Sequence, residues 1–299
     1  MATAISACGG SAPAPKPGYP ESGLVLLSIK DGAPRGSASI GQDVVAVTLS
    51  ADGRFAYLAD SAPGDVYAVS LPNLHTVWKQ HVGGAPFGLL QRGARLYVSL
   101  FDGAAVLELD PKTGVMMGTH QVPQGAAAIT ADASGRVVVA GTRGQVYVLD
   151  GGQLAAGNGF GIALVGGRLW TADYERAEIV PAGDDHRVGL PLPLFPFWLA
   201  PGAGDTLLIA AEGAVEDSDA GGVFSFDPVS GAFKILATPR DPDQVLQSGS
   251  MILVAAHGDG HVLVLEGEHS STWARGSAPV ALAVSDSLGL VVVAVNAHE

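Results

Sequence analysis

The sequence has a single cysteine, few basic residues and no long apolar segment. Because Cys8 has no second cysteine to pair with, neither a disulfide framework nor a cysteine-rich metal site holds the fold together. Lys and Arg number 16 against 29 Asp and Glu, a formal net charge of −13, and no basic cluster is present that would bind nucleic acid phosphates. The apolar run at residues 290–295 is far shorter than the roughly 18 to 20 residues that span a bilayer. Disulfide-stapled, nucleic-acid-binding and transmembrane classes are therefore excluded.

Glycine, proline and hydrophobic residues, by contrast, are abundant. The 41 glycines and 19 prolines interrupt helices too often for a helical bundle. Hydrophobic residues make up 47% of the chain, which is too many for a disordered one. The composition therefore predicts a large folded domain that is rich in turns.

A short unit recurs seven times along the chain. In each unit a small turn precedes an apolar strand, and these strands begin near Phe55, Leu96, Val137, Leu169, Leu207, Ile252 and Leu290. The steps between these positions average about 39 residues, the length of a propeller blade. The strands are nearly continuous apolar runs, as expected for sheets buried on both faces. The repeat predicts an all-β fold, a β-propeller of four-stranded antiparallel blades.

The two ends of the chain each hold half a blade. Two strands are predicted at residues 24–29 and 38–42, before the first complete unit, and the chain stops after two strands of its last unit. We therefore predict seven blades, the last of them closed by N- and C-terminal strands, which removes the open sheet edges that favour aggregation. The predicted organisation is a disordered tether over residues 1–23 and a propeller domain over residues 24–299.

Two motifs join the strands and units. The sequences DPKTG at residues 110–114 and DPVSG at 227–231 are typical of hairpin turns, and G-x-x-P-x-G at 83–88 leads into the next unit. Together with the glycine turns and aromatic-aliphatic strands, this pattern resembles the YVTN-type β-propellers, bacterial and archaeal surface or periplasmic proteins related to the quinoprotein amine dehydrogenase-like propellers. The YVTN signature itself reads YLAD at Tyr57 and YVSL at Tyr97. The resemblance implies a seven-bladed, WD-like propeller that serves as a binding scaffold or as an enzyme.

The N-terminal residues 5–8 read Ile-Ser-Ala-Cys and resemble a bacterial lipobox, in which Cys8 is the lipid attachment site. The proline-rich stretch that follows is expected to be an extended tether. Because the seven residues before Cys8 lack the positive charge and apolar core of a signal peptide, we expect the true start to lie upstream of Met1. These features predict an extracytoplasmic lipoprotein of the cell envelope, held to the membrane only through its lipid. A disordered tail with a chance cysteine is the alternative.

The candidate ligand contacts lie in the loops that meet at the mouth of a propeller's central channel. Eight residues of these loops are selected: Phe87, Arg143, Phe160, Tyr174, Arg176, Phe197, Trp198 and Asp243. The segment at residues 195–198, FPFW, is the densest aromatic group in the chain. Its rings are suited to clamp a ligand, and equally to plug the channel or pack between blades.

Two loops carry candidate metal ligands: His257, Asp259 and His261 in one, and Glu216, Asp217 and Asp219 in the other. Imidazole and carboxylate groups suit transition metals, but the glycines between the histidines also fit a tight turn. The acidic loop offers oxygen donors for Ca²⁺, or it is a charged loop facing water. Neither loop has the spacing of a standard metal site, so the sequence predicts no cofactor, with a divalent ion as the alternative.

No catalytic motif is present in the sequence. A G-x-S-x-G elbow is missing, and the aspartate turns lack the tryptophan of the quinone-binding element. We predict a monomeric, non-catalytic binding or scaffold module for a basic or neutral protein, peptide or small ligand. The alternative is a lactonase-like hydrolase or lyase with a divalent metal in the central channel. A mouth lined by Phe87, Phe160 and Phe197 favours the binding module, and three or more metal donors around one point favour the enzyme.

Overall fold

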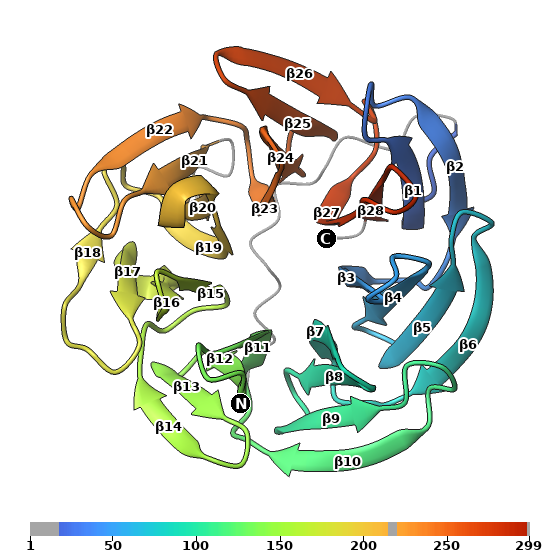
Figure 1. Cartoon of the computed structure of the whole chain (residues 1–299), viewed down its shortest axis with the longest axis horizontal. Helices are drawn as coiled ribbons and strands as arrows, with labels where there is room; N and C mark the ends of the chain where they lie inside the picture. The colour runs from blue at the N-terminus through green and yellow to red at the C-terminus, as the bar shows by residue number, and fades with distance from the viewer. Residues whose placement is uncertain (1–17, 215–219, 298–299) are drawn as a thin grey trace.

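The computed structural model describes residues 18–214 and 220–297. These residues form seven four-stranded antiparallel sheets, arranged as blades in a ring (Figure 1). The described helices are two short 3-10 turns, η1 (Tyr174–Arg176) and η2 (Ala203–Asp205). No helix in the described part of the chain has the length and apolarity needed to cross a membrane. The predicted all-β, seven-bladed propeller is confirmed.

Each blade runs from an innermost strand near the axis to an outermost strand at the rim (Figure 1). The innermost strands are β3 (Val44–Leu49), β7 (Pro86–Arg92), β11 (Ala126–Ala131), β15 (Ile162–Val165), β19 (Phe195–Pro201), β23 (Pro242–Ser248) and β27 (Pro279–Ser285). The second strands are β4 (Phe55–Asp60), β8 (Arg95–Leu100), β12 (Val137–Gly141), β16 (Arg168–Asp173), β20 (Leu207–Glu212), β24 (Met251–Ala256) and β28 (Leu290–Asn296). These second strands are the seven apolar runs of the sequence repeat.

The outer half of each blade is also built from two strands. The third strands are β5 (Asp65–Ser70), β9 (Ala105–Leu109), β13 (Gln145–Val148), β17 (Glu178–Pro181), β21 (Gly221–Phe226), β25 (His261–Glu266) and β1 (Ser22–Ser28). The outermost strands are β6 (His75–His81), β10 (Met116–Gln121), β14 (Gly152–Ala155), β18 (Val188–Gly189), β22 (Phe233–Ala237), β26 (His269–Trp273) and β2 (Pro34–Ser39). Exposed residues predominate in β6 and β10, so these outermost strands are largely open to water.

The second strands are buried on both faces, as their continuous apolar sequences predict. In β28 all seven residues are buried, and successive side chains point to opposite faces of the sheet. Val291 and Val293 pack against Leu253 of the β23–β26 blade. Val292, between them, packs against Leu58 of the β3–β6 blade. Because both faces of the strand meet a neighbouring blade, residues 290–295 are all apolar. The buried Asn296 at the strand end donates a hydrogen bond to Oδ1 of Asp43 at 2.8 Å.

The hydrophobic core is divided among the seams between neighbouring blades. The described residues form seven buried clusters, and each cluster joins side chains from two adjacent blades. Ile209 and Phe224, for example, pack with Trp170 of the preceding blade. A blade therefore has no complete core of its own, and the ring as a whole is the folding unit.

The ring is closed by pairing the two ends of the chain. Strand β1 runs antiparallel to β28 from Ser22 opposite Asn296 to Ser28 opposite Leu290, within the order β2-β1-β28-β27. Two predicted strand bounds were shifted: β1 begins before residue 24, and β2 spans Pro34–Ser39 rather than residues 38–42. The exposed β2 sequence, PRGSAS, has no apolar pattern from which its bounds could be predicted.

A buried hydroxyl connects two neighbouring blades close to the axis. Ser99 of β8 is fully buried, and its Oγ accepts a hydrogen bond from the Gly88 N–H at 2.7 Å and donates one to the Ala127 carbonyl at 2.6 Å. A Cβ on Gly88 would lie 2.5 Å from the same carbonyl oxygen. The close approach of β7 and β11 therefore requires glycine at one position and a small hydroxyl side chain at the other.

Leu26→Ala tests the closure of the ring. Leu26 of β1 is fully buried opposite Val292, so its truncation should cost about 2–5 kcal/mol of unfolding free energy. Leu154→Ala is the matched control, because Leu154 on the outermost β14 is 37% exposed and its loss should cost no more than about 0.5 kcal/mol. Urea unfolding measures both, and equal costs for the two variants would contradict the closure by β1.

Ser99→Ala tests the link between the β7–β10 and β11–β14 blades. The substitution leaves the buried Gly88 N–H and Ala127 carbonyl without this partner, so we expect a loss of about 1–3 kcal/mol. Ser271→Ala, on the exposed side of β26, should be nearly neutral in the same denaturation experiment. A neutral Ser99→Ala would show that these two hydrogen bonds contribute no net stability.

Candidate functional site

In each blade the innermost strand runs antiparallel to the second strand. The innermost strands therefore start, and the second strands end, at the same rim of the ring. Val44 pairs with Asp60 on this rim, and Phe195 pairs with Glu212. We call this rim the channel mouth. It is where the predicted ligand contacts lie, because their loops join second to third strands or enter a new blade.

β-Bulges at the mouth place particular side chains on the rim. In β19 the pairing shifts between Pro196 and Trp198, so that Phe197 is an extra residue. In β23 the same shift makes Asp243 the extra residue, and in β7 the shift covers Phe87. A bulge bends its strand and redirects a side chain, and bulges are frequent next to binding sites. Phe87, Phe197 and Asp243, three of the predicted ligand contacts, are therefore each placed at the mouth by a β-bulge.

Six aromatic rings form a continuous group at the mouth, which we call the aromatic wall: Phe87, Phe101, Phe160, Tyr174, Phe195 and Phe197. Phe160 is its centre. The Phe160 ring centroid lies 5.0 Å from that of Phe197 and 5.8 Å from that of Phe87. Phe197 is buried, whereas the other five rings are half-buried and keep part of their surface open to solvent.

A cavity of about 210 Å³ occupies the channel next to the aromatic wall. Six of the innermost strands contribute to its lining: β3, β7, β11, β19, β23 and β27. Phe87, Phe197 and Trp198 line it together with Asp243, while most of its remaining lining is aliphatic. The cavity is nevertheless lined by polar and apolar groups in similar measure, with Thr48, Gln244 and the carboxylate of Asp243 among them.

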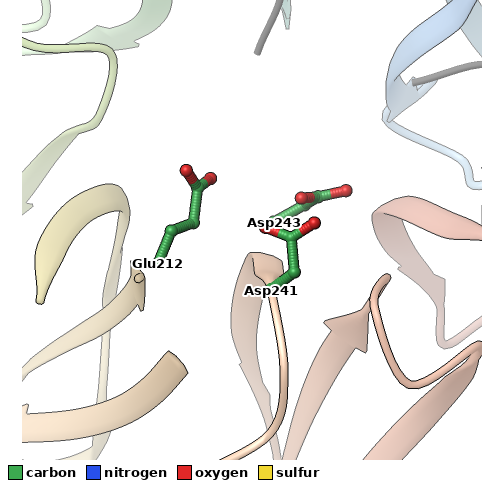
Figure 2. Close-up of side chains that lie close together, drawn as sticks. All are labelled: Glu212, Asp241 and Asp243. Carbon is green, nitrogen blue, oxygen red and sulfur yellow. The ribbon is translucent and has the colours of Figure 1, made fainter. Parts of the chain in front are cut away.

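Three carboxylates meet at the mouth beside the aromatic wall, where Glu212 pairs with Phe195 across strands β19 and β20. One oxygen each of Glu212, Asp241 and Asp243 lies within 4.8 Å of the other two. Figure 2 shows the three side chains leaving the end of β20 and the start of β23. Glu212 and Asp241 are buried, and burial raises the pKa of Asp241 to about 6. We call these three residues the carboxylate group.

Neighbouring side chains lie against two members of the carboxylate group. The Tyr174 hydroxyl donates a hydrogen bond to Oε2 of Glu212 at 3.2 Å, which connects the group to the aromatic wall. Nδ1 of His257 lies 3.6 Å from Oδ2 of Asp243, and His257 is 1% exposed. The mouth is therefore one site with an aromatic side and an acidic side.

Most of the predicted ligand contacts do come together. Phe87, Phe160, Tyr174 and Phe197 belong to the aromatic wall, and Asp243 belongs to the carboxylate group. In the FPFW segment, Phe195 and Phe197 face the mouth, while the half-buried Trp198 lines the cavity and packs between blades. Packing between blades, one of the uses that the sequence left open for this segment, is thus observed for Trp198, and the clamping of a ligand stays a prediction.

The two predicted arginines lie apart from the aromatic wall. Arg176 is 3.3 Å from the buried carboxylate of Asp173, which Arg187 also binds at 2.6 Å. Arg143 is exposed in the turn after β12. A ligand role for either arginine stays a prediction.

The predicted metal ligands of the β24–β25 loop have separate surroundings. Asp259 pairs with the guanidinium of Arg240 at 2.8 Å, whereas His257 faces Asp243. His261 begins β25, and its Nδ1 lies 3.2 Å from the Asp259 carbonyl. The group of three donors found among the described residues includes neither Asp259 nor His261, so their role as metal ligands stays a prediction.

Two other predictions concern residues that the structure does not describe. Cys8, the predicted lipid attachment site, lies in residues 1–17. Glu216, Asp217 and Asp219, the predicted calcium loop, lie in residues 215–219. Both predictions therefore stand as they were made from the sequence.

Three residues of the site, Phe101, Glu212 and Asp241, were not among those selected from the sequence. Phe101 directly follows β8, in a loop that joins a second to a third strand, and that position was the available signal. Glu212 ends β20 and enters a loop of the same kind. Asp241 precedes β23 with a φ of 44°, a conformation that non-glycine residues seldom adopt. Such a backbone conformation cannot be seen in the sequence.

Solved structures of low sequence identity share the fold. The structure of the periplasmic gluconolactonase PpgL of Pseudomonas aeruginosa matches with a TM-score of 0.67 and 15% identity, over 92% of this chain and 99% of that chain. BamB of Moraxella catarrhalis matches with a TM-score of 0.58 and 17% identity, over 96% and 94%. A functionally unknown protein of Desulfotomaculum acetoxidans matches with a TM-score of 0.63 and 11% identity, over 85% and 99%.

No family model matches the chain, and no curated protein matches it in sequence. Identities this low show a common architecture and nothing about activity. The resemblance to YVTN-like propellers is therefore supported at the level of the fold, which this chain shares with lactonase and BamB propellers.

Proposed function

We propose that the protein is a non-catalytic binding module whose aromatic wall holds a ring-bearing or apolar group of a small ligand or peptide. The observation that carries the proposal is the convergence of six rings at the mouth, five of them half-buried, beside a small cavity. Phe160 touches four other rings and still keeps part of its face in water.

Exposed aromatic surface of this kind favours a partner. Each square ångström of apolar surface removed from water contributes about 25 cal/mol, and ring pairs in offset or edge-to-face contact add about 0.5–1.5 kcal/mol. A ligand ring inserted between Phe87, Phe101 and Phe160 would gain binding free energy both from buried apolar surface and from ring contacts. Contiguous apolar patches on a soluble surface usually mark interaction sites.

The size of the cavity limits what can enter it. Its volume of about 210 Å³ is below the roughly 300–1,000 Å³ of pockets that enclose drug-sized ligands. One ring or one side chain therefore fits inside, while the rest of the ligand lies across the mouth. The formal net charge of −13 and the carboxylate of Asp243 favour a neutral or basic ligand.

A second candidate function is the lactonase-like hydrolase, favoured by the carboxylate group. Three acidic side chains around one point meet the condition that we set for the enzyme. The structurally similar PpgL is described as a gluconolactonase. Proton release from gluconolactone, with and without CaCl₂, tests this function, and a rate equal to spontaneous hydrolysis would exclude it for that substrate.

The location of the protein is proposed from the sequence alone. A lipid on Cys8 and the proline-rich segment after it would hold the propeller at the outer surface of a membrane. Because like charges repel, the acidic propeller would stay away from anionic lipid headgroups and would meet its partners off the membrane surface.

Binding of aromatic fragments tests the aromatic wall. In saturation-transfer NMR with indole, phenol and naphthalene in EDTA buffer, we expect binding to the wild type and at least about tenfold weaker binding to Phe160→Ala, because the central ring is lost. Phe233→Ala is the matched control, since Phe233 is also half-buried in a ring pair but lies on the outermost β22.

The outcome that overturns the proposal is specific. If none of the three fragments binds the wild type, or if Phe160→Ala binds as well as Phe233→Ala does, the aromatic wall is not the binding site. Phe101→Ala, at the edge of the wall, provides a second test should Phe160→Ala fail to fold.

A further inference from the structure

One buried carboxylate at the mouth differs from the others. Asp60 is fully buried, and it accepts a hydrogen bond from the backbone N–H of Asp43 at 2.6 Å. Asp173, also fully buried, is bound by Arg187 at 2.6 Å. Asp241 is 7% exposed, yet no hydrogen bond or ion pair from any described residue reaches its carboxylate. Because burial of an uncompensated carboxylate is costly, its persistence suggests a ligand outside the chain.

The Asp241 side chain extends toward two further carboxylates. Figure 2 shows its carboxylate beside that of Asp243, with Glu212 facing them from the end of β20. One oxygen from each residue lies within 4.8 Å of the other two. Three like charges so close together repel one another unless a proton or a cation lies among them.

The backbone holds the three residues in this arrangement. The Asp241 carbonyl accepts a hydrogen bond from the His257 N–H at 3.0 Å, which fixes the turn whose φ at Asp241 is 44°. Asp243 is the bulge residue of β23, and Glu212 ends β20, paired with Gly221 and Phe195. Ligands fixed to strand ends need little rearrangement to bind an ion.

We propose that Glu212, Asp241 and Asp243 bind a divalent cation, Ca²⁺ in particular, at the seam between the β19–β22 and β23–β26 blades. The Tyr174 hydroxyl, which donates a hydrogen bond to Glu212, orients that carboxylate, and the imidazole of His257 lies 3.6 Å from Asp243. The site goes beyond the proposed function, since the aromatic wall can hold a ring whether or not a cation is bound.

The number and kind of the oxygen donors favour Ca²⁺ over Mg²⁺. Ligands of Ca²⁺ lie about 2.3–2.6 Å from the ion, so two ligands on opposite sides are about 5 Å apart. The three oxygens, all within 4.8 Å of one another, fit inside such a shell. Mg²⁺ usually keeps several of its waters and is bound through one or two carboxylates rather than three. Three carboxylates supply up to six hard oxygens, and water fills the remaining positions of a six- to eight-coordinate ion.

Calorimetric titration of the EDTA-treated whole chain with CaCl₂ tests the site. We expect one ion per chain and a rise in Tm on the order of 5 °C when Ca²⁺ is at about 100 times its Kd. Asp241→Asn removes one charge without changing the shape of the side chain, and it should weaken Ca²⁺ binding at least about tenfold. Glu212→Gln should act in the same direction.

Asp286→Asn is the matched control, because Asp286 is exposed in the turn between β27 and β28, at the opposite rim. It should bind Ca²⁺ as the wild type does. The Tm of each variant in EDTA shows that it is folded; removal of the buried Asp241 charge should not lower it.

Three results would overturn the proposal. The first is no heat and no Tm shift in the wild type up to about 10 mM CaCl₂, beyond the range of the weakest biological calcium sites. The second is equal affinity in Asp241→Asn and Asp286→Asn. The third, equal affinity for MgCl₂ at matched ionic strength, would overturn the assignment to Ca²⁺. Fragment binding is measured in EDTA, so failure of this site leaves the aromatic wall separately tested.

Discussion

The pairing of β1 with β28 is the interaction on which the rest of the structure depends. Seven residues from each end of the chain pair in register, and their side chains complete the seams to the β3–β6 and β23–β26 blades. Every other blade depends in the same way on its neighbours, because the buried clusters lie between blades. Ring closure therefore contributes to all seams at once. It also fixes the diameter of the channel and the positions of the strand ends around its mouth.

The rigid ring explains how the mouth can hold groups that are unfavourable in themselves. The part of the Phe87 and Phe160 rings that stays open to water, and the buried carboxylate of Asp241 with its raised pKa, each destabilise an unliganded protein. The buried seams between blades offset the cost of these rings and of this carboxylate. The bulges in β7, β19 and β23 direct side chains to the rim. The seams between blades therefore stabilise the ring, and the mouth carries the groups that we propose bind a ligand. Tyr174 joins the two sides of the mouth, because its ring packs on Phe160 and its hydroxyl binds Glu212.

The fold was largely predictable because its strongest constraint is visible in the sequence. A strand such as β28, buried on both faces, is an almost continuous apolar run, and seven such runs define the blades. The exposed β2 and the two-residue β18 have no such pattern, so their bounds could not be predicted. The aromatic side of the site followed from loop positions. The carboxylate group did not, because the approach of Glu212 to Asp241 depends on how two blades pack across a seam.

The central claim is that the channel mouth binds ligand on an aromatic and an acidic side. The most direct measurement is a crystal structure of the protein grown with CaCl₂ and indole, with anomalous data to locate calcium. The account predicts an anomalous peak between Glu212, Asp241 and Asp243, and indole density against Phe160. Clear density for neither at the mouth, with both additives bound elsewhere or absent, would contradict it.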